Sequence, residues 1–529
     1  MDFLVFTIIA LFLYGIHKFV TLNNDYFRKR GVAHMKPTFL FGNMIPFLFR
    51  RQWFKFAKTM YTAFPRQKII GMFDMRQPFF CVRDPDVLKQ LAVKDFDHFE
   101  DHRMFVDENV DALFGNSLIC LRGMKWRDMR ATLSPAFSGS KMRQMFELVA
   151  ECADETSFTI KENVLLAGGH IDCEMKDLFS RMTNDVISST AFGHKINSFA
   201  DPTNDFYLAG KQFMKFSSPL AGVKFLVMLL LPKVAAFLDI NFSNSKVMNF
   251  FRSMVLRNME CRTKQGLFRP DMINILMNVR RGKANEVQSA EETNAEGFAT
   301  TVESTIGKKI VKRVWTDDEL AAQCFLFFLA GFDTSSSMLS FLSHELTMNP
   351  DIQQKLYDEV RQTFDNLNGQ RLTYDALQKM KYMDACISEG LRHWPPAATT
   401  DRRCVKDYDY DDGQVNFKIT KGQYFVIPIY GLHHDEKYWP NPYVFDPERF
   451  SEENRHTVNT GAYIPFGLGP RNCIGSRFAL MEVKAIVFYV LLNFKLEPNE
   501  QTQVQLKLLK TPFSLRAEKG VNVRLKLRK

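Results

Sequence analysis

The spacing of apolar residues along the chain predicts a protein built mainly from α-helices. Over most of the sequence the apolar side chains recur every three or four residues, which is the period of one helix face. Alternating patterns typical of strands are few and short, at residues 67–73, 78–82 and 423–428. No internal repeat is visible. We therefore expect a mainly α fold with small β-sheets.

The best-defined helix is predicted to begin after Thr316 and to end at Met348. Thr316 and Glu319 have the spacing of a capping box, and Asn349-Pro350 ends the pattern. A helix over residues 317–348 would be about 48 Å long and would cross the whole molecule. Its middle carries the sequence AGFDT at residues 330–334. Since glycine, aspartate and threonine are poor helix formers, we expect a functional reason for them.

An apolar run opens the chain at residues 3–16 and, after two polar residues, continues to Leu22. At about 1.5 Å per residue this segment is about 30 Å long, enough to cross a hydrocarbon core. No small-residue cleavage site follows it, which favours an uncleaved signal-anchor over a signal peptide. One acidic residue precedes the run and several basic residues follow it, so the body should face the cytosol. These residues are Asp2 before the run, and Lys18, Arg28, Lys29 and Arg30 after it.

The rest of the chain divides into a hinge and one large body. Residues 1–22 form the expected anchor, residues 23–43 a basic hinge, and residues 44–529 the body, whose length alone allows about three or four domains or one large catalytic unit. The hinge has one proline, Pro37, which is expected to leave the tilt of the body loosely fixed. Residues 219–231 are apolar and too short to span a bilayer, which predicts either a buried helix or a patch that dips into the membrane. Residues 280–307 are polar without a clear period, which predicts a mobile surface loop.

Composition narrows the class of protein. The chain has 529 residues, of which 46% are hydrophobic, so collagen, disordered and small disulfide-rich proteins are excluded. The 9 cysteines are scattered without zinc-site spacing and read as reduced thiols, one of which has a special role. The net charge of +10 favours an anionic lipid surface or an acidic partner rather than nucleic acid. The 50 phenylalanines suit an apolar cavity, with plain core packing as the alternative.

The strongest chemical signal is the sequence FGLGPRNCIG at residues 466–475. Its glycines and proline predict a tight loop whose backbone amides can point at Cys473, and Gly475 lets a helix begin close behind. Amide donors and a helix N-terminus both stabilise a thiolate. Such a thiolate is a metal ligand or a nucleophile. A buried structural cysteine in a glycine turn is the alternative.

This segment resembles the haem-binding loop of cytochrome P450 enzymes, FxxGxRxCxG, and four further motifs occur in the family's order. WRDMR at residues 126–130 resembles WxxxR, AGFDT resembles the oxygen-activating AGxDT, EGLR at residues 389–392 matches ExxR, and PERF occupies residues 447–450. The resemblance covers essentially the whole chain and is greatest to insect microsomal, xenobiotic-metabolising enzymes of families nine and six. It implies the P450 fold, with haem between the long central helix and the Cys473 loop, and a single catalytic domain over residues 44–529.

The resemblance also implies roles for single residues. Cys473 would be the axial thiolate ligand of the iron. Thr334 would place its hydroxyl against dioxygen and Asp333 would link it to solvent, while a bond from Thr334 to the carbonyl four residues earlier is compatible with this. The residues expected to hold the haem are Trp126, Arg130, Ala330, Arg402, Phe466, Arg471 and Cys473. A buried structural network is expected at Glu389, Arg392 and Arg449. Pocket walls are expected from Phe114, Leu326, Leu329, Ala397, Ala398 and Phe513, with ordinary core packing as the alternative for each.

These roles imply a haem-thiolate monooxygenase that oxidises apolar small molecules, such as plant toxins or insecticides, with O₂. The cofactor would be haem b, and NADPH–cytochrome P450 reductase would supply the electrons, with cytochrome b5 as an additional partner. A basic face for an acidic reductase would comprise Lys125, Arg127, Arg130, Arg143, Arg471 and Arg477. The expected location is the endoplasmic reticulum membrane, with the body in the cytosol. A haem-thiolate isomerase and a non-catalytic haem sensor are the alternatives, and the retained threonine and cysteine motifs favour the monooxygenase.

Overall fold

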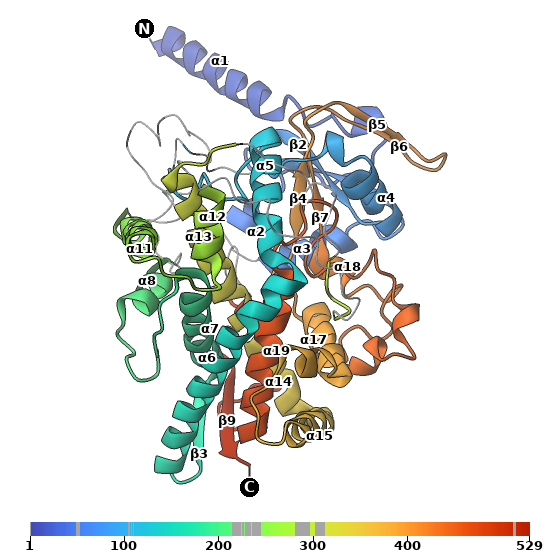
Figure 1. The fold of residues 1–529 in the computed structure, drawn as a ribbon. Coiled ribbons are helices and arrows are strands. Elements are labelled where there is room, and N and C mark those ends of the chain that lie inside the picture. The colour runs from blue at the N-terminus through green and yellow to red at the C-terminus, as the bar shows by residue number, and fades with distance from the viewer. Residues whose placement is uncertain are drawn as a thin grey trace.

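The computed structural model describes residues 2–48, 53–103, 106, 108, 111–213, 224, 227, 234, 238, 245–280, 297–301, 313–510 and 515–528. Helices predominate among them, as the apolar period predicted (Figure 1). The α-helices are α1 Asp2–Thr21, α2 Ile45–Leu48, α3 Trp53–Thr62, α4 Pro85–Lys89, α5 Gly123–Leu133, α6 Gly139–Leu166, α7 Met175–Phe192, α8 Asp205–Phe213, α11 Ser245–Gln265, α12 Met272–Arg280, α13 Asp317–Ala330, α14 Ser336–Met348, α15 Pro350–Asn366, α16 Tyr374–Gln378, α17 Lys381–His393, α18 Ile429–Leu432 and α19 Ser476–Asn493. Short 3₁₀ helices are η1 Arg28–Arg30, η3 Phe96–His98, η4 Ser134–Phe137, η7 Pro447–Phe450 and η8 Arg455–Thr457, and π-helical turns are η2 Gln90–Lys94 and η6 Gly331–Ser335.

The described strands form three small sheets. The first contains β1 Ile69–Asp74, β2 Gln77–Val82, β7 Tyr424–Ile427 and β4 Thr400–Arg403 in the order β1-β2-β7-β4. Within it β2 and β7 are parallel and the other pairs antiparallel. The second contains β3 His170–Glu174, β9 Asn522–Leu527 and β8 Phe494–Glu497, and the third is the hairpin of β5 Tyr408–Asp411 and β6 Asn416–Ile419. The three strands predicted from the sequence, β1, β2 and β7, are neighbours in one sheet.

The core is organised around the central helix and α19. The central helix comprises α13, η6 and α14, and it spans Asp317–Met348 as predicted. It is apolar enough to cross a membrane, but 72% of its most apolar window is buried, so it is a core helix. Most residues of α19 are buried as well, as expected of a helix with apolar residues around most of its circumference. α19 packs on α6, and α14 packs on α7.

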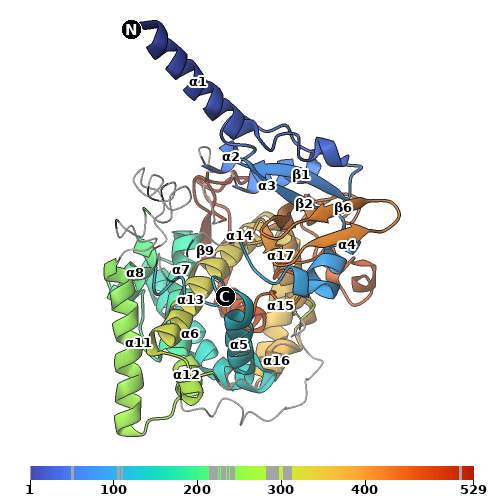
Figure 2. The ribbon, with the colours of Figure 1, turned by 90° about the horizontal axis from the view of Figure 1, so that it is seen from above.

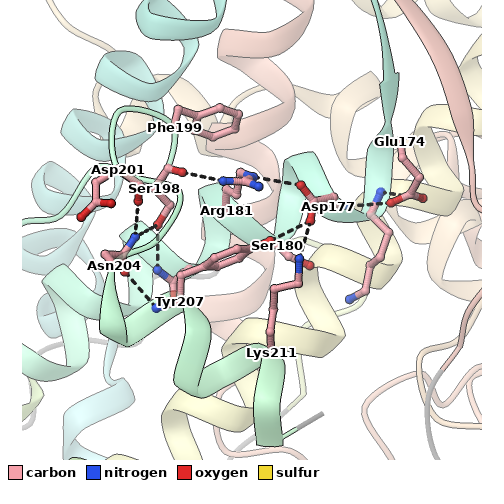
Figure 3. Close-up of polar contacts among 12 residues, drawn as sticks. Glu174, Asp177, Ser180, Arg181, Ser198, Phe199, Asp201, Asn204, Tyr207 and Lys211 are labelled. Atoms are coloured by element: carbon pink, nitrogen blue, oxygen red, sulfur yellow. Dashed lines mark hydrogen bonds and ion pairs between the residues drawn. The ribbon is translucent and has the colours of Figure 1, made fainter. Parts of the chain in front are cut away.

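A carboxylate on α7 fastens α8 to the body (Figure 3). Asp177 accepts hydrogen bonds from Arg181 Nε at 2.9 Å, Tyr207 Oη at 2.8 Å and Lys211 Nζ at 3.1 Å. Burial raises the pKa of Asp177, but hydrogen bonds from these three donors outweigh it and hold the pKa below its usual value. Because Tyr207 and Lys211 belong to α8, this charged centre joins the two helices.

The first helix projects away from the body in both ribbon views (Figures 1 and 2). Its apolar side chains are exposed and its length suits a membrane span. The residues after it are packed on the first sheet. Phe27 is fully buried with its ring 5.1 Å from that of Phe73, and a Cβ on Gly71 would overlap the Phe27 ring. Arg76 stacks 3.7 Å from the ring centre of Phe19, in the last turns of α1. The residues that follow α1 are therefore packed on the sheet, while the tilt of the body on a membrane stays a prediction.

Two further predictions concern residues 219–231, expected to form a buried helix or a membrane patch, and residues 280–307, expected to form a mobile loop. The apolar stretch at residues 219–231 lies outside the described residues, apart from Lys224 and Val227. Of residues 280–307 the structure describes Arg280, which ends α12, and residues 297–301. The latter are packed against the body, with Ala299 buried. For residues 297–301 the prediction of a mobile surface loop is wrong, because Phe298 packs against the main apolar core and Ala299 lies in it.

Candidate functional site

The central helix widens in its middle, where it borders a cavity. The predicted capping box is present at its start, with Glu319 N–H donating to Thr316 Oγ1 at 3.2 Å and Thr316 N–H donating to Glu319 Oε2 at 2.9 Å. Between α13 and α14 the helix makes one π-helical turn at η6, a feature frequent at functional sites. Thr334 Oγ1 donates to Ala330 O at 2.5 Å, so the expected back-bond exists. Ala330, Gly331 and Thr334 all line the cavity.

Asp333 points to the other side of this turn. Its carboxylate Oδ1 lies 3.0 Å from Lys176 Nζ and 3.3 Å from Arg516 Nη2. Lys176 Nζ also donates to the Ser336 hydroxyl at 2.6 Å. Burial lowers the pKa of Lys176, and the neighbouring Asp333 opposes that shift. Asp333 is therefore held by two cations outside the cavity wall, one residue from the hydroxyl of Thr334.

The loop at residues 466–475 brings Cys473 to the cavity wall. Gly467 and Gly469 have φ values of +80° and +75°, which favour glycine, and a Cβ on Gly469 would overlap a carbonyl oxygen of η2. Cys473 N–H donates to Phe466 O at 2.8 Å, which closes the loop. Burial raises the pKa of the Cys473 thiol, while the backbone N–H of Gly475 and the charge of Arg130 oppose this shift. The exposed surface of Cys473 faces the cavity.

Three buried arginines surround this loop. Arg130 donates to Asn472 O at 2.7 Å and Asn472 Oδ1 at 2.8 Å. Arg471 donates to Leu121 O at 2.8 Å and stacks 3.8 Å from the ring centre of Trp126. Arg402 is fully buried, and its Nε has no hydrogen-bond partner among the described residues. Arg402 Nη2 donates to the carbonyl of Leu468 at 2.7 Å. Arg471 also has an acidic neighbour, because Asp101 Oδ1 lies 3.5 Å from its Nη2.

Burial makes the charge of these arginines costly. Burial lowers the pKa of Arg402 to about 10, and burial lowers that of Arg471 well below its usual value. Buried cations are stabilised by anionic partners, which here include Asp101 beside Arg471 and Asp401 near Arg402, and a bound carboxylate would add to them. Arg130, Arg471 and Trp126 line the cavity together with Cys473. A sulfur donor beside cationic groups suits an iron porphyrin, which presents a metal and two carboxylates.

The cavity lies between the Thr334 turn and the Cys473 loop. Its volume is about 500 Å³, within the range of roughly 300–1,000 Å³ typical of cofactor and ligand sites. Apart from the polar groups near Cys473, its described wall is mostly apolar and includes Leu326, Phe327, Met338 and Ile387. The residues present therefore fit a haem between the central helix and the loop.

A buried ion network lies behind the loop. Arg392 donates to Glu389 through Nε at 2.6 Å and Nη2 at 2.8 Å, and both side chains are fully buried. Arg449 Nε lies 3.5 Å from Glu389 Oε1. The structure thus brings together the three residues expected to form this network, from α17 and η7.

Sequence comparison shows the family to which this chain belongs. The family model described as Cytochrome P450 matches residues 33–524. This chain belongs to the cytochrome P450 family. It is 42% identical to "Probable cytochrome P450 9f2" of Drosophila melanogaster, over 99% of this chain and 98% of that protein. It is 39% identical to "Cytochrome P450 9e2" of Blattella germanica, over 97% and 95% of the two chains, and 33% identical to "Cytochrome P450 6j1" of the same insect, over 98% and 97%. The chain is accordingly a P450 monooxygenase that uses haem, O₂ and electrons from a redox partner.

The expected site residues of this P450 separate into two groups. Trp126, Arg130, Ala330, Thr334, Phe466, Arg471 and Cys473 line the cavity, and so do the expected pocket residues Leu326 and Ala397. Among the described residues, the wall does not include Asp333, Arg402, Phe114, Leu329 or Ala398. Phe114 and Leu329 are partly buried against the main apolar core and Ala398 is buried in another apolar cluster, so a pocket role for these three stays a prediction. Leu329 precedes Ala330 and therefore points to another face of the helix. Phe513 lies outside the described residues.

Sequence reasoning missed two titratable residues of this P450. His102 lines the cavity beside Arg471, with Nδ1 3.0 Å from Asp401 O, and burial lowers its pKa despite the nearby Asp401. Glu482 on α19 is fully buried, and burial raises its pKa to about 8. The Ser335 hydroxyl donates to Glu482 Oε2 at 2.6 Å. Neither residue belongs to a motif recognised in the sequence, and a charged residue in the apolar pattern of α19 was the one available signal for Glu482.

The basic residues on and near α5 are largely paired. Lys125 contacts Glu108 at 2.7 Å and Glu319 at 3.1 Å. Arg127 contacts two acidic residues, Asp97 at 2.8 Å and Glu100 at 2.7 Å. Arg143 on α6 contacts Asp375 at 2.5 Å. The positive charge expected on this face of the P450 is therefore reduced by neighbouring carboxylates.

Proposed function

We propose that this P450 is a membrane-anchored monooxygenase that hydroxylates apolar foreign compounds, such as plant toxins and insecticides, with electrons from NADPH. The observation that carries this proposal is the position of Cys473 and Thr334 on one mostly apolar cavity. In the overall reaction one substrate C–H bond, one O₂, one NADPH and one proton yield an alcohol, one water and NADP⁺. The atoms and electrons balance without a further reactant.

Haem b is the proposed cofactor, and when bound it supplies an iron centre that accepts electrons and activates dioxygen. Cys473 Sγ is the proposed iron ligand, supported by the Gly475 amide and by the N-terminus of α19 three residues on. Arg130 and Arg471 are the proposed partners of the propionates, with Trp126 beside them. Arg402 acts from behind the loop, which it holds through Leu468.

Proton delivery is the proposed role of Asp333 and Thr334. The Thr334 hydroxyl lies on the cavity wall and donates its proton to Ala330 O, so its oxygen can accept a hydrogen bond from a molecule in the cavity. Asp333 is adjacent in the chain and faces Lys176 and Arg516, both of which are partly accessible to solvent. In this proposal, protons pass from the solvent-accessible side of Asp333 across the η6 turn to the Thr334 hydroxyl.

The substrate class follows from the described wall. Its charged and titratable members are His102, Arg130, Arg471 and Cys473, all in the region assigned to the haem. Apart from the amide of Asn472 next to Cys473, the rest of the described wall is apolar or carries hydroxyl groups, which favours neutral apolar molecules. Apolar contacts discriminate by only about 1–3 kcal/mol each, so we expect broad selectivity.

The proposed location is the endoplasmic reticulum membrane, with the body on the cytosolic side. Support comes from the exposed apolar helix α1 and from the basic residues that follow it. NADPH–cytochrome P450 reductase is the proposed electron donor, with cytochrome b5 as a second one. Because the cations around α5 are mostly paired, we expect the apparent affinity for the reductase to depend only weakly on salt.

The proposal is tested by reconstituting the full chain in lipid vesicles with the reductase and NADPH. Product formation and NADPH consumption are followed on a panel of apolar compounds for wild type and Thr334→Ala. Thr347→Ala is the matched control, since Thr347 Oγ1 makes the same back-bond, to Ser343 O at 2.7 Å, on the same helix away from the described wall. We expect Thr334→Ala to lower the product formed per NADPH by roughly tenfold or more, and Thr347→Ala to match wild type.

Cys473→Ala should abolish the thiolate-type spectrum of the reduced carbon monoxide complex, and retention of that spectrum would refute the ligand assignment. Rearrangement of an organic peroxide, used as the substrate without reductase or NADPH, would indicate the haem-thiolate isomerase instead. Haem binding without turnover on the whole panel would indicate a sensor.

A further inference from the structure

A short piece of the polar stretch between α12 and α13 is docked on the body. The structure describes residues 297–301 of this stretch. Thr300 N–H donates to Gly297 O at 2.9 Å, which closes a turn. Ala299 is 5% exposed and belongs to the main apolar core. These residues are therefore part of the packed structure.

Phe298 makes the main apolar contact of this segment. Its ring centre lies 5.2 Å from that of Phe450 in η7 and 5.5 Å from that of Tyr463. Aromatic pairs at such distances are favourable beyond the area they bury. The backbone N–H of Phe298 donates to Asp384 Oδ2 at 2.9 Å, on α17. Ring and backbone thus bind different elements.

Gly297 lets the segment approach a buried ion pair. Lys484 Nζ of α19 lies 3.0 Å from Asp384 Oδ1, and the Lys484 side chain is 1% exposed. A Cβ on Gly297 would overlap Asp384 Oδ1 and lie 3.1 Å from Lys484 Nζ. A buried ion pair is favourable only where hydrogen bonds satisfy its remaining polar atoms. The Phe298 amide supplies one of these bonds to Asp384.

The last contact reaches the start of α19. Thr301 Oγ1 lies 2.9 Å from the hydroxyl oxygen of Ser476, and Ser476 is buried. Ser476 is the first residue of α19 and follows Cys473 by three positions. Through Asp384, Phe450 and Ser476 the segment contacts α17, η7 and α19 at once.

The aromatic residues around Phe298 continue to the buried ion network. Tyr463 Oη donates to Ser388 O at 2.9 Å, next to Glu389 in the chain. The ring centre of Phe450 lies 5.9 Å from that of Trp439, and the guanidinium of Arg392 lies 5.4 Å from the Trp439 ring centre. The segment is therefore in packing contact with the elements that support the Cys473 loop from behind.

We propose that residues 297–301 form a strap that positions the Cys473 loop by joining α17, η7 and α19. The strap holds the first turn of α19 against α17 and so keeps Cys473 and Gly475 in one arrangement. Phe298 and Thr301 are its positioning residues. The proposal rests on the proposed role of Cys473 as the iron ligand. When the strap is loosened, the haem loses sulfur ligation more readily while the fold persists.

The test uses the full-length holoenzyme in lipid nanodiscs. Phe298→Ala removes the ring contact, Phe298→Leu restores an apolar side chain, and Thr301→Val removes the hydroxyl contact at nearly constant shape. The matched control is Phe268→Ala, because Phe268 is 73% exposed in the connection between α11 and α12. The reduced carbon monoxide spectrum follows the fraction of haem with thiolate ligation during warming, and circular dichroism follows the fold.

We expect Phe298→Ala to lose the thiolate-type spectrum about fivefold faster than wild type, the effect of losing about one contact. Thr301→Val should be intermediate, and Phe298→Leu and Phe268→Ala should be near wild type. Spectral loss should precede unfolding. Wild-type rates in both Phe298→Ala and Thr301→Val would overturn the strap, as would spectral loss that merely follows unfolding. If Phe298→Ala does not fold, the rate at which Thr301→Val loses the thiolate-type spectrum tests the strap on its own, and a wild-type rate would overturn it. A wild-type protein without the thiolate-type spectrum would instead overturn the role of Cys473.

Discussion

Replacing Arg392 with alanine is expected to remove most of the stability of the fold. The Arg392 guanidinium donates twice to the carboxylate of Glu389, at 2.6 and 2.8 Å, where neither side chain is accessible to solvent. It also donates to the carbonyl oxygens of His433 at 2.8 Å and Pro442 at 2.9 Å. Arg449 remains near Glu389 after the substitution, but at 3.5 Å it makes a weaker contact.

The magnitude follows from what alanine leaves behind. Breaking a buried ion pair by removing one partner costs about 3–5 kcal/mol. Two buried carbonyl groups also lose a donor, at about 1 kcal/mol or more each. Together these losses are comparable to the whole stability of a typical protein, about 5–15 kcal/mol. We therefore expect Arg392→Ala to give little folded protein and little bound haem.

The assay measures haem content and the urea midpoint by tryptophan fluorescence for the full chain. Arg361→Ala is the control, because Arg361 forms an exposed pair with Asp365 at 2.8 Å, and such pairs contribute only about 0.2–1 kcal/mol. The double variant Glu389→Leu with Arg392→Met removes both charges and should recover part of the stability. A stable Arg392→Ala holoprotein within about 1 kcal/mol of wild type would refute the reasoning.

Three further perturbations are expected to separate local roles. Burial raises the pKa of Glu482 to about 8, so the native protein keeps a proton that the unfolded chain releases above its ordinary pKa of 4.5. Wild-type stability should therefore fall by up to about 1.4 kcal/mol per pH unit between these values, and urea titrations at several pH values should show that Glu482→Gln removes this slope. Lys176→Met should lower the product formed per NADPH and increase the solvent isotope effect, with an unchanged haem spectrum; unchanged coupling would argue against Asp333 as proton donor. Arg76→Ala should broaden the tilt of the haem in oriented bilayers, measured by linear dichroism, without weakening membrane binding, and an identical tilt would contradict the packed anchor.

Features that depend on nearby residues were predictable from the sequence. The capping box at Thr316 involves two residues within one turn, and the structure contains both of its hydrogen bonds. The ion pair of Glu389 and Arg392 is one helix turn apart, and the glycines around Cys473 are required by the loop itself. In each case a short spacing determines which groups can meet.

Contacts between distant segments were not predictable in the same way. Asp333 is paired with Lys176 and Arg516, which are 157 and 183 positions away in the chain. The docking of Phe298 depends equally on the arrangement of α17, η7 and α19, so its surroundings in the sequence look like those of a solvated loop. The residues of the pocket wall were equally hard to predict. Leu329 and Ala330 are neighbours in the sequence, but only Ala330 reaches the described wall.

The arginines near Cys473 link the stability of this P450 to its cofactor. Arg402 and Arg471 donate mainly to neutral carbonyl oxygens, and burial lowers the pKa of both groups. Cations buried in this way destabilise the folded chain unless an anion approaches them. Asp101 offsets part of this cost at Arg471, which lines the cavity, and the carboxylates of a bound haem would lower it further in addition to filling the apolar cavity. Because a ligand that binds only the folded state stabilises it, haem loss should weaken the fold by more than the lost apolar contacts alone.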